Sequence, residues 1–309
     1  MTAPPPRPRR QTLQMFGGRS EASGRLVGTS DGPLRFDRLL GRGGIGEVYE
    51  ATELGTARRV AVKTLLPAFR NVNEAVRRME REAKAGGLID HPNIADVIGF
   101  GILSDGTPYL VMELIEGVDL AALLGDGALE PRRALGILRQ ALEGVGHAHA
   151  LGILHRDLKP ENIMVARGPD GAELVKILDF GIAKLVGLAA SELGSEKLTE
   201  TGAIFGTPAY MAPEQALGRP AAPGTDLYTL GVILFEMITG RRPFVGTDVN
   251  ATLRMQISAP VPELVRFAPW CTAELDDVIR RALQKSPAAR FATASEMCAA
   301  VLAAERSLG

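Results

Sequence analysis

The chain has few cysteines and almost no net charge. Its 309 residues include two cysteines, Cys271 and Cys298, which are far apart and in no metal-ligand spacing. We expect two free, buried thiols, which favours a reducing cytoplasm over an oxidising compartment. The formal net charge is −1, so the protein has no global field that would attract nucleic acid or an anionic membrane. We therefore expect no nucleic-acid partner and a cytoplasmic location.

Long apolar runs are also missing. The best candidate for a membrane span, residues 230–240, is too short and contains Glu236, so we interpret it as a buried helix. The first residues lack the apolar segment of a signal peptide and are rich in proline, arginine and glycine. We expect residues 1–33 to form a disordered tail, whose arginines either stay solvated or contact an acidic partner.

The remaining chain changes character near its first third. Residues 34–113 contain five strand-like runs and one helical stretch that begins at Asn73. Helical patterns dominate after Leu120, with one short strand pair before residue 178. The pattern predicts an α+β fold with two lobes. We place a small lobe with a five-stranded antiparallel sheet and one helix at residues 34–115, and a larger, mainly helical lobe at 116–305.

A glycine-rich stretch joins the first two predicted strands. It contains Gly41, Gly43 and Gly46. Glycines let a backbone approach a phosphate closely and expose its N–H groups. A dinucleotide-binding fold would continue from such a stretch into a helix, whereas here a strand follows, which argues against that fold. By itself the stretch is equally compatible with a plain hairpin turn.

A lysine lies in the middle of the third predicted strand. Lys63 has apolar neighbours on both sides, so its ammonium must face solvent or find an anion. Glu82 in the following helix is a candidate partner, and Glu80 competes with it on spacing. Both an internal ion pair and a surface salt bridge of small energetic value remain open at this point.

Two short polar segments of the larger lobe carry groups suited to phosphate chemistry. The segment HRDLKPEN contains Asp157, Lys159 and Asn162, and the segment DFG follows a predicted strand and contains Asp179. A carboxylate can accept a hydroxyl proton, and amide and carboxylate oxygens suit a hard cation such as Mg²⁺. Taken alone, HRDLKPEN would also be compatible with a polar surface loop.

Five motifs in order identify a family resemblance. GRGGIGEV, VAVK, HRDLKPEN, DFG and APE follow one another between about Phe36 and Ala304, with the expected elements between them. The chain resembles a eukaryotic-type (Hanks-type) protein kinase domain, most like the bacterial serine/threonine kinases. The resemblance implies that ATP and Mg²⁺ are bound, with Mn²⁺ also compatible. It implies transfer of the γ-phosphoryl group to Ser or Thr hydroxyls of proteins, including this chain itself.

The same resemblance assigns roles to individual residues. Lys63 would contact the α- and β-phosphates and pair with Glu82. Asp157 would act as the base or orient the acceptor hydroxyl, and Lys159 would balance charge on the γ-phosphoryl. Asn162 and Asp179 would hold the metal ion. The implied nucleotide pocket consists of Leu40, Gly41, Gly43, Gly46, Val48, Ala61, Lys63, Met112, Glu113, Ile115, Asp119 and Met164.

Further positions are implied to support the site. Glu214 would pair with Arg290, and Asp226 would brace the catalytic loop from a buried helix. Thr207 sits where serine/threonine kinases contact the catalytic loop, and together with Lys159 it favours Ser/Thr over Tyr acceptors.

The resemblance makes residues 179–214 the activation loop. Thr199 and Thr201 match the phosphorylated pair of bacterial relatives, and Arg156 would hold the added phosphate. The alternative is that these threonines are idle loop residues. Gly86, one turn after Glu82, replaces a larger apolar side chain that we expect would help lock the active arrangement, so we predict a loosely held helix. The alternative is that the helix ends before Gly86.

Two other functions compete with that of an active kinase. A pseudokinase scaffold usually lacks the lysine, the base or the metal aspartate, and this chain has all of them. Small-molecule phosphotransferases of related fold usually lack the APE segment, which is present. The four histidines follow no metal-ligand spacing. A dimer through the smaller lobe is compatible with the resemblance alone.

Overall fold

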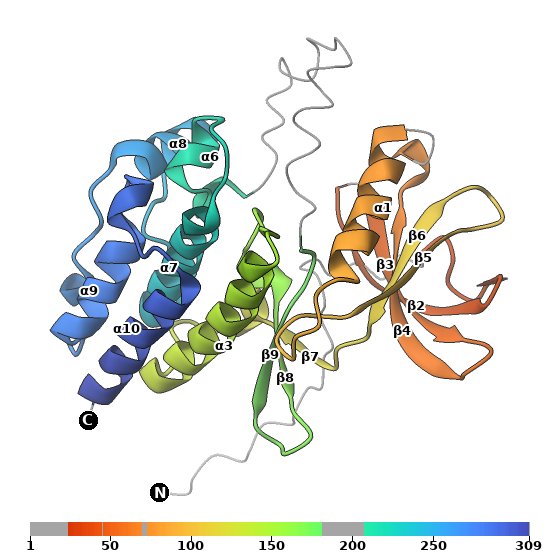
Figure 1. Ribbon diagram of the computed structural model, residues 1–309, viewed down its shortest axis with the longest axis horizontal. Coiled ribbons are helices and arrows are strands. Elements are labelled where there is room, and N and C mark those ends of the chain that lie inside the picture. Colours follow the sequence, from red (N-terminus) through yellow and green to blue (C-terminus); the bar gives the residue numbers. More distant parts are fainter. Residues whose placement is uncertain (1–23, 45, 70–72, 181–206, 309) are drawn as a thin grey trace, which may run out of the picture.

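The smaller lobe is built on an antiparallel sheet (Figure 1). The computed structural model describes residues 24–44, 46–69, 73–180 and 207–308. The sheet has the strand order β1-β2-β3-β4-β6-β5. The five predicted strands are present, and a two-residue strand makes the sheet six-stranded. The strands are β1 (Ser30–Asp31), β2 (Leu34–Arg42), β3 (Gly46–Glu53), β4 (Arg58–Leu65), β5 (Val97–Ile102) and β6 (Pro108–Glu113).

The two faces of this sheet carry different side chains. Successive strand residues point to opposite faces, so Val60 and Val62 of β4 join an apolar cluster with Phe36, while Ala61 and Lys63 lie on the other face. Helix α1 (Asn73–Gly86) packs against β5 and β6, where its Met79 is buried with Leu65 and Leu110. The alternation places Lys63 on the face away from the Phe36 cluster.

The chain segment before β2 belongs to the smaller lobe, which differs from the expected tail boundary at residue 33. Arg25 Nη1 lies 2.5 Å from Asp105 Oδ2. The hydroxyl of Ser104 donates to Asp31 at 2.5 Å, and Leu26 packs against the apolar cluster of the sheet. These contacts pair residues far apart in the chain, which composition cannot reveal. The tail prediction for residues 1–23 lies outside the described residues.

Helix α1 ends at a glycine that packs closely on the sheet. A Cβ atom added to Gly86 would lie 2.3 Å from Cγ2 of Val97 on β5, far inside van der Waals contact. The expectation that a larger side chain at this position would support the helix is therefore wrong for this geometry, because the close approach of α1 to β5 needs a glycine. Helix α1 includes Gly86, so it does not end before that residue.

The larger lobe is mainly helical. Its core consists of one large apolar cluster in which the helix α7 (Pro223–Thr239) is buried along most of its length. The other described elements of this lobe are β7 (Gly117–Asp119), α2 (Leu120–Leu124), α3 (Pro131–Ala150), β8 (Ile163–Arg167), β9 (Glu173–Ile177), α6 (Pro213–Ala216), α8 (Val249–Ser258), α9 (Ala273–Ala282) and α10 (Ala294–Ser307). Short 3₁₀ turns lie at Pro160–Asn162, Pro208–Tyr210, Leu264–Arg266 and Pro287–Ala289, and one in the smaller lobe lies at Pro67–Phe69.

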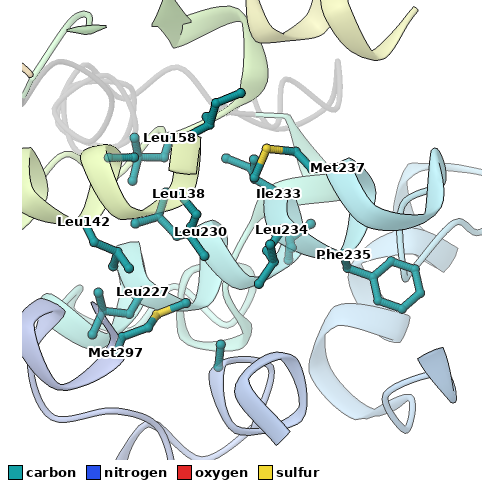
Figure 2. Packing of buried hydrophobic residues seen from close by; sticks show 14 of the residues in the cluster. Leu138, Leu142, Leu158, Leu227, Leu230, Ile233, Leu234, Phe235, Met237 and Met297 are labelled. Carbon is teal, nitrogen blue, oxygen red and sulfur yellow. The ribbon is translucent and has the colours of Figure 1, made fainter. Parts of the chain in front are cut away.

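The core reaches directly under the HRDLKPEN segment. Figure 2 shows Leu158 beside Leu138 of α3 and near Ile233 of α7. All three are buried in the same cluster. Burying a leucine side chain stabilises a fold by about 1.5–3 kcal/mol. Leu158 therefore anchors its polar neighbours in the loop to the helices α3 and α7.

Two expectations about composition can be compared with the structure. Both cysteines, Cys271 and Cys298, are free and half-buried. Among the described residues, no helix combines the length and the apolar character that crossing a bilayer requires.

Candidate active site

The segment HRDLKPEN forms a loop between α3 and β8 that one buried carboxylate holds. Asp226 of α7 accepts hydrogen bonds from the backbone N–H groups of His155 at 2.9 Å and Arg156 at 2.8 Å. The same carboxylate lies 2.8 Å from Nε2 of His149. Burial alone would raise the pKa of Asp226, but the hydrogen bond from His149 and the nearby histidines keep it below its usual value. Asp226 therefore braces the loop as a buried anion.

The loop contains a strained residue. Arg156 has φ +68°, in the left-handed region that non-glycine residues rarely occupy. Such a conformation costs about 1–3 kcal/mol and persists where neighbouring contacts fix it. The bond from the Arg156 N–H to Asp226 supplies one such contact, and the side chain of Gln215 donates to the Arg156 carbonyl at 2.8 Å.

The loop brings three polar side chains of the sequence prediction together. Lys159 Nζ lies 3.4 Å from Oδ2 of Asp157. The Asn162 amide donates through Nδ2 to the carbonyl of Asp157 at 2.9 Å. Because its nitrogen faces that carbonyl, the oxygen of Asn162 is the atom left to face a cation.

Asp179 and Phe180 lie next to this loop, and Asp179 reaches the smaller lobe. The N–H of Leu178 donates to the carbonyl of Asn162 at 2.9 Å, so the backbones before Asp179 and at Asn162 are adjacent. Asp179 has φ +59°, and its Oδ2 lies 3.1 Å from Nζ of Lys63. The ring of Phe180 meets that of His155 edge-on at 4.8 Å. These contacts turn the Asp179 carboxylate toward the lysine of β4.

The side chains present fit a magnesium ion by their chemistry. Asn162 and Asp179 offer one amide oxygen and one carboxylate, and Mg²⁺ prefers such hard oxygen ligands together with phosphate oxygens. In the part of the chain that the structure describes, no group of three His, Cys, Asp or Glu side chains is arranged to hold a metal. The donor set therefore suits a metal ion whose remaining ligands come from a bound nucleotide and water.

The predicted nucleotide pocket lies between the sheet and β8. Strand register places Val48 opposite both Gly41 and Lys63, and places Ala61 opposite Met112. The glycine-rich turn is closed by a bond from the Gly43 N–H to the Gly46 carbonyl at 2.8 Å. A Cβ atom on Gly46 would lie 2.5 Å from the Thr64 carbonyl oxygen, so this position requires glycine.

The apolar part of the pocket draws residues from both lobes. Leu40 packs on a cluster that contains Ile115 and Met164, which are buried. A cavity of about 10 Å³ lies behind Met112 and is also lined by Val97 and Phe180, which is about the space that one water needs.

Two predicted pocket residues use their side chains elsewhere. Glu113 accepts from Nζ of Lys176 at 2.8 Å, and its N–H donates to the carbonyl of Asp96 at 2.9 Å, so the predicted contact with a base falls to its own carbonyl. Asp119 caps α2 by accepting from the N–H of Ala122 at 2.7 Å, and burial raises its pKa. Its ribose contact therefore stays a prediction that would need the second carboxylate oxygen.

Of the remaining predicted residues, the structure describes Glu214, Arg290 and Thr207. Arg290 is buried and forms a two-pronged ion pair with Glu214, with both N–O distances at 2.8 Å. Thr207 is half-buried and precedes the turn Pro208–Tyr210. The Glu82 side chain, Thr199 and Thr201 lie outside the described residues, so the Lys63–Glu82 pair and the phosphorylation sites remain predictions.

Sequence reasoning missed several supporting side chains. His149 donates to Asp226, a role that the spacing of the histidines does not predict. Gln215 joins the APE segment to the catalytic loop, and Gln256 of α8 contacts the turn Pro208–Tyr210. The signal available for Gln256 was a glutamine at a buried position of a helix. A buried amide needs hydrogen-bond partners, so such a residue indicates a supporting contact.

Comparison with known proteins supports the same assignment. The family model "Protein kinase domain" matches residues 34–302. The chain is 41% identical over 273 residues to the serine/threonine-protein kinase Pkn1 of Myxococcus xanthus, covering 88% of this chain and 38% of that protein. It is 40% identical to the serine/threonine-protein kinase PknA of Mycobacterium tuberculosis, with 91% of this chain and 63% of that protein covered. It is 37% identical to PrkC of Bacillus subtilis, with 86% and 39% covered.

A solved structure shows the same architecture. The kinase domain of PknI from Mycobacterium tuberculosis superposes with a TM-score of 0.69 at 27% identity, covering 90% of this chain and 98% of that one. The chain spans between about 38% and 63% of the length of the curated relatives named above. The matched motifs, the fold and these relatives together show that the chain belongs to the protein kinase family, in the group of bacterial serine/threonine kinases.

Proposed function

We propose that this protein transfers the γ-phosphoryl group of ATP to Ser or Thr hydroxyls of proteins. The observation that carries the proposal is that site residues of the two lobes lie next to each other. Lys63 of the smaller lobe lies 3.1 Å from Asp179, and Asp179 follows a backbone segment bonded to Asn162 in the loop that also holds Asp157 and Lys159. The cations and carboxylates of both lobes thus converge on one place.

Phosphoryl transfer depends on the alignment of the reacting groups more than on covalent bonds to the protein. Phosphoryl transfer needs fixed positive charge near the phosphates and an acceptor oxygen held in line. Lys63 binds the phosphates of ATP, and Lys159 balances charge on the group that moves. Asp157 orients the acceptor hydroxyl and accepts its proton. A bound Mg²⁺, held by Asn162 and Asp179, would neutralise charge on the phosphate oxygens.

The acceptor class follows from the loop. The Nζ of Lys159 is 3.4 Å from the Asp157 carboxylate, so a cation stands directly beside the group that would bind the acceptor hydroxyl. The relatives named above are serine/threonine-protein kinases. We therefore propose Ser and Thr rather than Tyr as acceptors.

Phosphorylation of the chain's own loop is part of the proposal. Nε of Arg156 is buried, and it has no hydrogen-bond partner among the residues that the structure describes. A buried guanidinium nitrogen without a partner is costly, and a phosphothreonine oxygen would satisfy it. Thr199 and Thr201 are the proposed sources of that phosphate.

Location and self-association complete the proposal. Use of ATP and the two free cysteines favour the cytoplasm. For a partner we propose a second copy of the chain at β5, the edge strand of the sheet, which exposes Ile98 and Ile102. Sedimentation equilibrium tests this, since Ile98→Lys would leave only monomer if the edge forms the contact.

The test of the activity is phosphate transfer from γ-labelled ATP to a Ser/Thr peptide library. We expect the wild type to label peptides and Asp157→Asn to lose about 10²–10⁴-fold in rate, the range typical of a positioned base. Equal labelling by both proteins would contradict the role of Asp157. Nucleotide binding without any labelling would favour a scaffold.

A further inference from the structure

A buried glutamine of α8 holds a turn near the end of the predicted activation loop. Gln256 is 0% exposed. Its Nε2 donates to the carbonyl of Ala209 at 2.6 Å and lies 3.4 Å from the carbonyl of Pro208. Both carbonyls belong to the 3₁₀ turn Pro208–Tyr210, and such turns leave carbonyls that need a donor.

The orientation of this amide is fixed by a chain of hydrogen bonds. The hydroxyl of Tyr228 on α7 donates to Oε1 of Gln256 at 2.6 Å. The same hydroxyl accepts from Nζ of Lys285 at 3.2 Å. Because a tyrosine hydroxyl has one proton, the lysine directs it toward Gln256, and the amide nitrogen is left to face the turn.

The lysine at the start of this chain is held among aromatic rings. Nζ of Lys285 lies 3.7 Å from the ring centre of Phe244, and its carbonyl partner on α8 is Met255 at 3.4 Å. The Arg290 guanidinium lies 4.7 Å from the ring centre of Tyr228. The Tyr228 hydroxyl is thus fixed between two partners, Gln256 of α8 and Lys285, while Arg290 packs on its ring.

The chain that follows this turn is bonded to the catalytic loop through Gln215. Gln215 accepts from the N–H of Ala212 at 3.1 Å and donates to the carbonyl of Arg156, the residue before Asp157. The Tyr210 hydroxyl donates to Glu236 at 2.6 Å. The segment 207–212 therefore borders the place where an acceptor hydroxyl must approach Asp157.

We propose that Gln256 is a positioning residue for the protein substrate: by fixing the carbonyls of Pro208 and Ala209 it sets the surface on which the acceptor chain docks. The inference rests on the proposed function, because it concerns docking of the protein that receives the phosphate. Nucleotide binding uses the other side of the site, at Lys63 and Met112, so it should not depend on Gln256.

The experiment compares steady-state kinetics of three variants with the wild type, using an acceptor peptide chosen from a Ser/Thr library. Gln256→Met keeps the length and loses all hydrogen bonds, and Tyr228→Phe removes only the orienting hydroxyl. Arg254→Ala on the exposed side of α8 is the control. We expect Gln256→Met to raise the KM for peptide roughly 5- to 30-fold, the effect of losing a buried hydrogen bond. Tyr228→Phe should raise it less.

The KM for ATP should change less than about 2-fold in all variants, which separates positioning from general damage to the fold. Hydrogen exchange of segment 207–212 should become faster in Gln256→Met and stay unchanged in Arg254→Ala. An unchanged KM for peptide, or equal losses toward ATP and peptide, would overturn the inference. A wild type that labels no library peptide would instead overturn the proposed function, and the inference with it.

Discussion

The two halves of the candidate site are held in place by different means. In the larger lobe, the catalytic loop has irregular backbone, and one carboxylate, Asp226, takes two of its N–H groups. In the smaller lobe, Lys63 and Val48 are positioned by strand pairing along the whole of β3 and β4. A loop depends on a few buried polar contacts, whereas a sheet spreads its support over many. Single substitutions should therefore damage the first half more than the second.

The largest effect should come from the anchor of the catalytic loop. Asp226→Ala leaves the N–H groups of His155 and Arg156 and Nε2 of His149 without their acceptor. Each unsatisfied buried group costs about 1–3 kcal/mol, so we expect the free energy of unfolding to fall by about 3 kcal/mol or more. Urea titration measures it. Phosphate transfer should fall with it, because the strained Arg156 and the adjacent Asp157 lose their support.

The matched control is another aspartate that accepts a backbone N–H at the surface. Asp248 caps α8 by accepting from Ala251 at 2.7 Å. Asp248→Ala should cost only about 1 kcal/mol, the usual value of a helix cap. Equal losses in the two variants would remove the distinction between a buried anchor and an exposed cap.

The next effect tests close packing in the smaller lobe. Gly86→Ala places a Cβ atom 2.3 Å from Cγ2 of Val97, and overpacking of this kind costs about 1–3 kcal/mol. Combining it with Val97→Ala should recover part of the loss, because the second change opens the space. Thermal and urea unfolding of the two single variants and the double variant give the coupling free energy.

A second glycine provides the opposite expectation. Gly136 lies within α3, and a Cβ atom there would have no neighbour within 4 Å. Gly136→Ala should stabilise the protein by about 0.5–1 kcal/mol through helix propensity alone. Two results would show that contact with β5 does not explain Gly86. One is a lower free energy of unfolding in Gly136→Ala, and the other is purely additive losses of stability in Gly86→Ala and Val97→Ala.

A smaller effect depends on pH and concerns Lys285 in the larger lobe. Burial, with a further contribution from Arg290, lowers the pKa of Lys285 from its ordinary value of 10.5 to about 8. Below pH 8 the lysine is charged in both folded and unfolded chains, and burial penalises the fold fully. Between pH 8 and 10.5 the folded chain releases the proton first, so this penalty is relieved as pH rises.

The measurement for this prediction is the difference in unfolding free energy between wild type and Lys285→Met across pH 7–10.5. As pH rises, the unfolding free energy of the wild type should increase relative to that of Lys285→Met by about 1 kcal/mol. This value is reduced because the ammonium is partly exposed. A difference that stays constant, or that shifts the other way, would contradict a depressed lysine pKa.

The smallest effect concerns the segment before β2. Arg25→Ala removes the contact with Asp105 at the edge of the smaller lobe. Surface ion pairs contribute about 0–1 kcal/mol and weaken in salt, so we expect a change below about 1 kcal/mol that shrinks further at high ionic strength. A larger, salt-independent loss in urea titrations would show that this segment supports the sheet by other means.

The sequence predicts the two lobes and most elements because hydrophobic periodicity and turn residues are local signals. The helical pattern predicted after Leu120 is confirmed, for example by α3, which spans Pro131–Ala150 with Glu130 as its cap. The strand pair after the catalytic loop and its turn are also as expected. The family motifs then located the catalytic loop and the nucleotide-binding sheet.

Contacts between distant segments were beyond the reach of local signals. The clash that keeps Gly86 a glycine depends on Val97 of a neighbouring strand, and composition suggested a loose helix instead. The bonds of Gln256 to the turn at Pro208 and Ala209 join residues 47 and 48 positions apart. Such pairs follow from the packing of α6, α7 and α8, which no periodicity reveals.

The measurement that tests the account most directly is intact mass after incubation with Mg-ATP, for the wild type, Asp157→Asn and the double variant Thr199→Ala/Thr201→Ala. The account predicts added phosphate on the wild type, mapped to residues 185–206, and none on Asp157→Asn. The double variant should lose the increments that map to those threonines. A wild type that binds nucleotide and gains no mass, or an Asp157→Asn protein that gains as much, would contradict it.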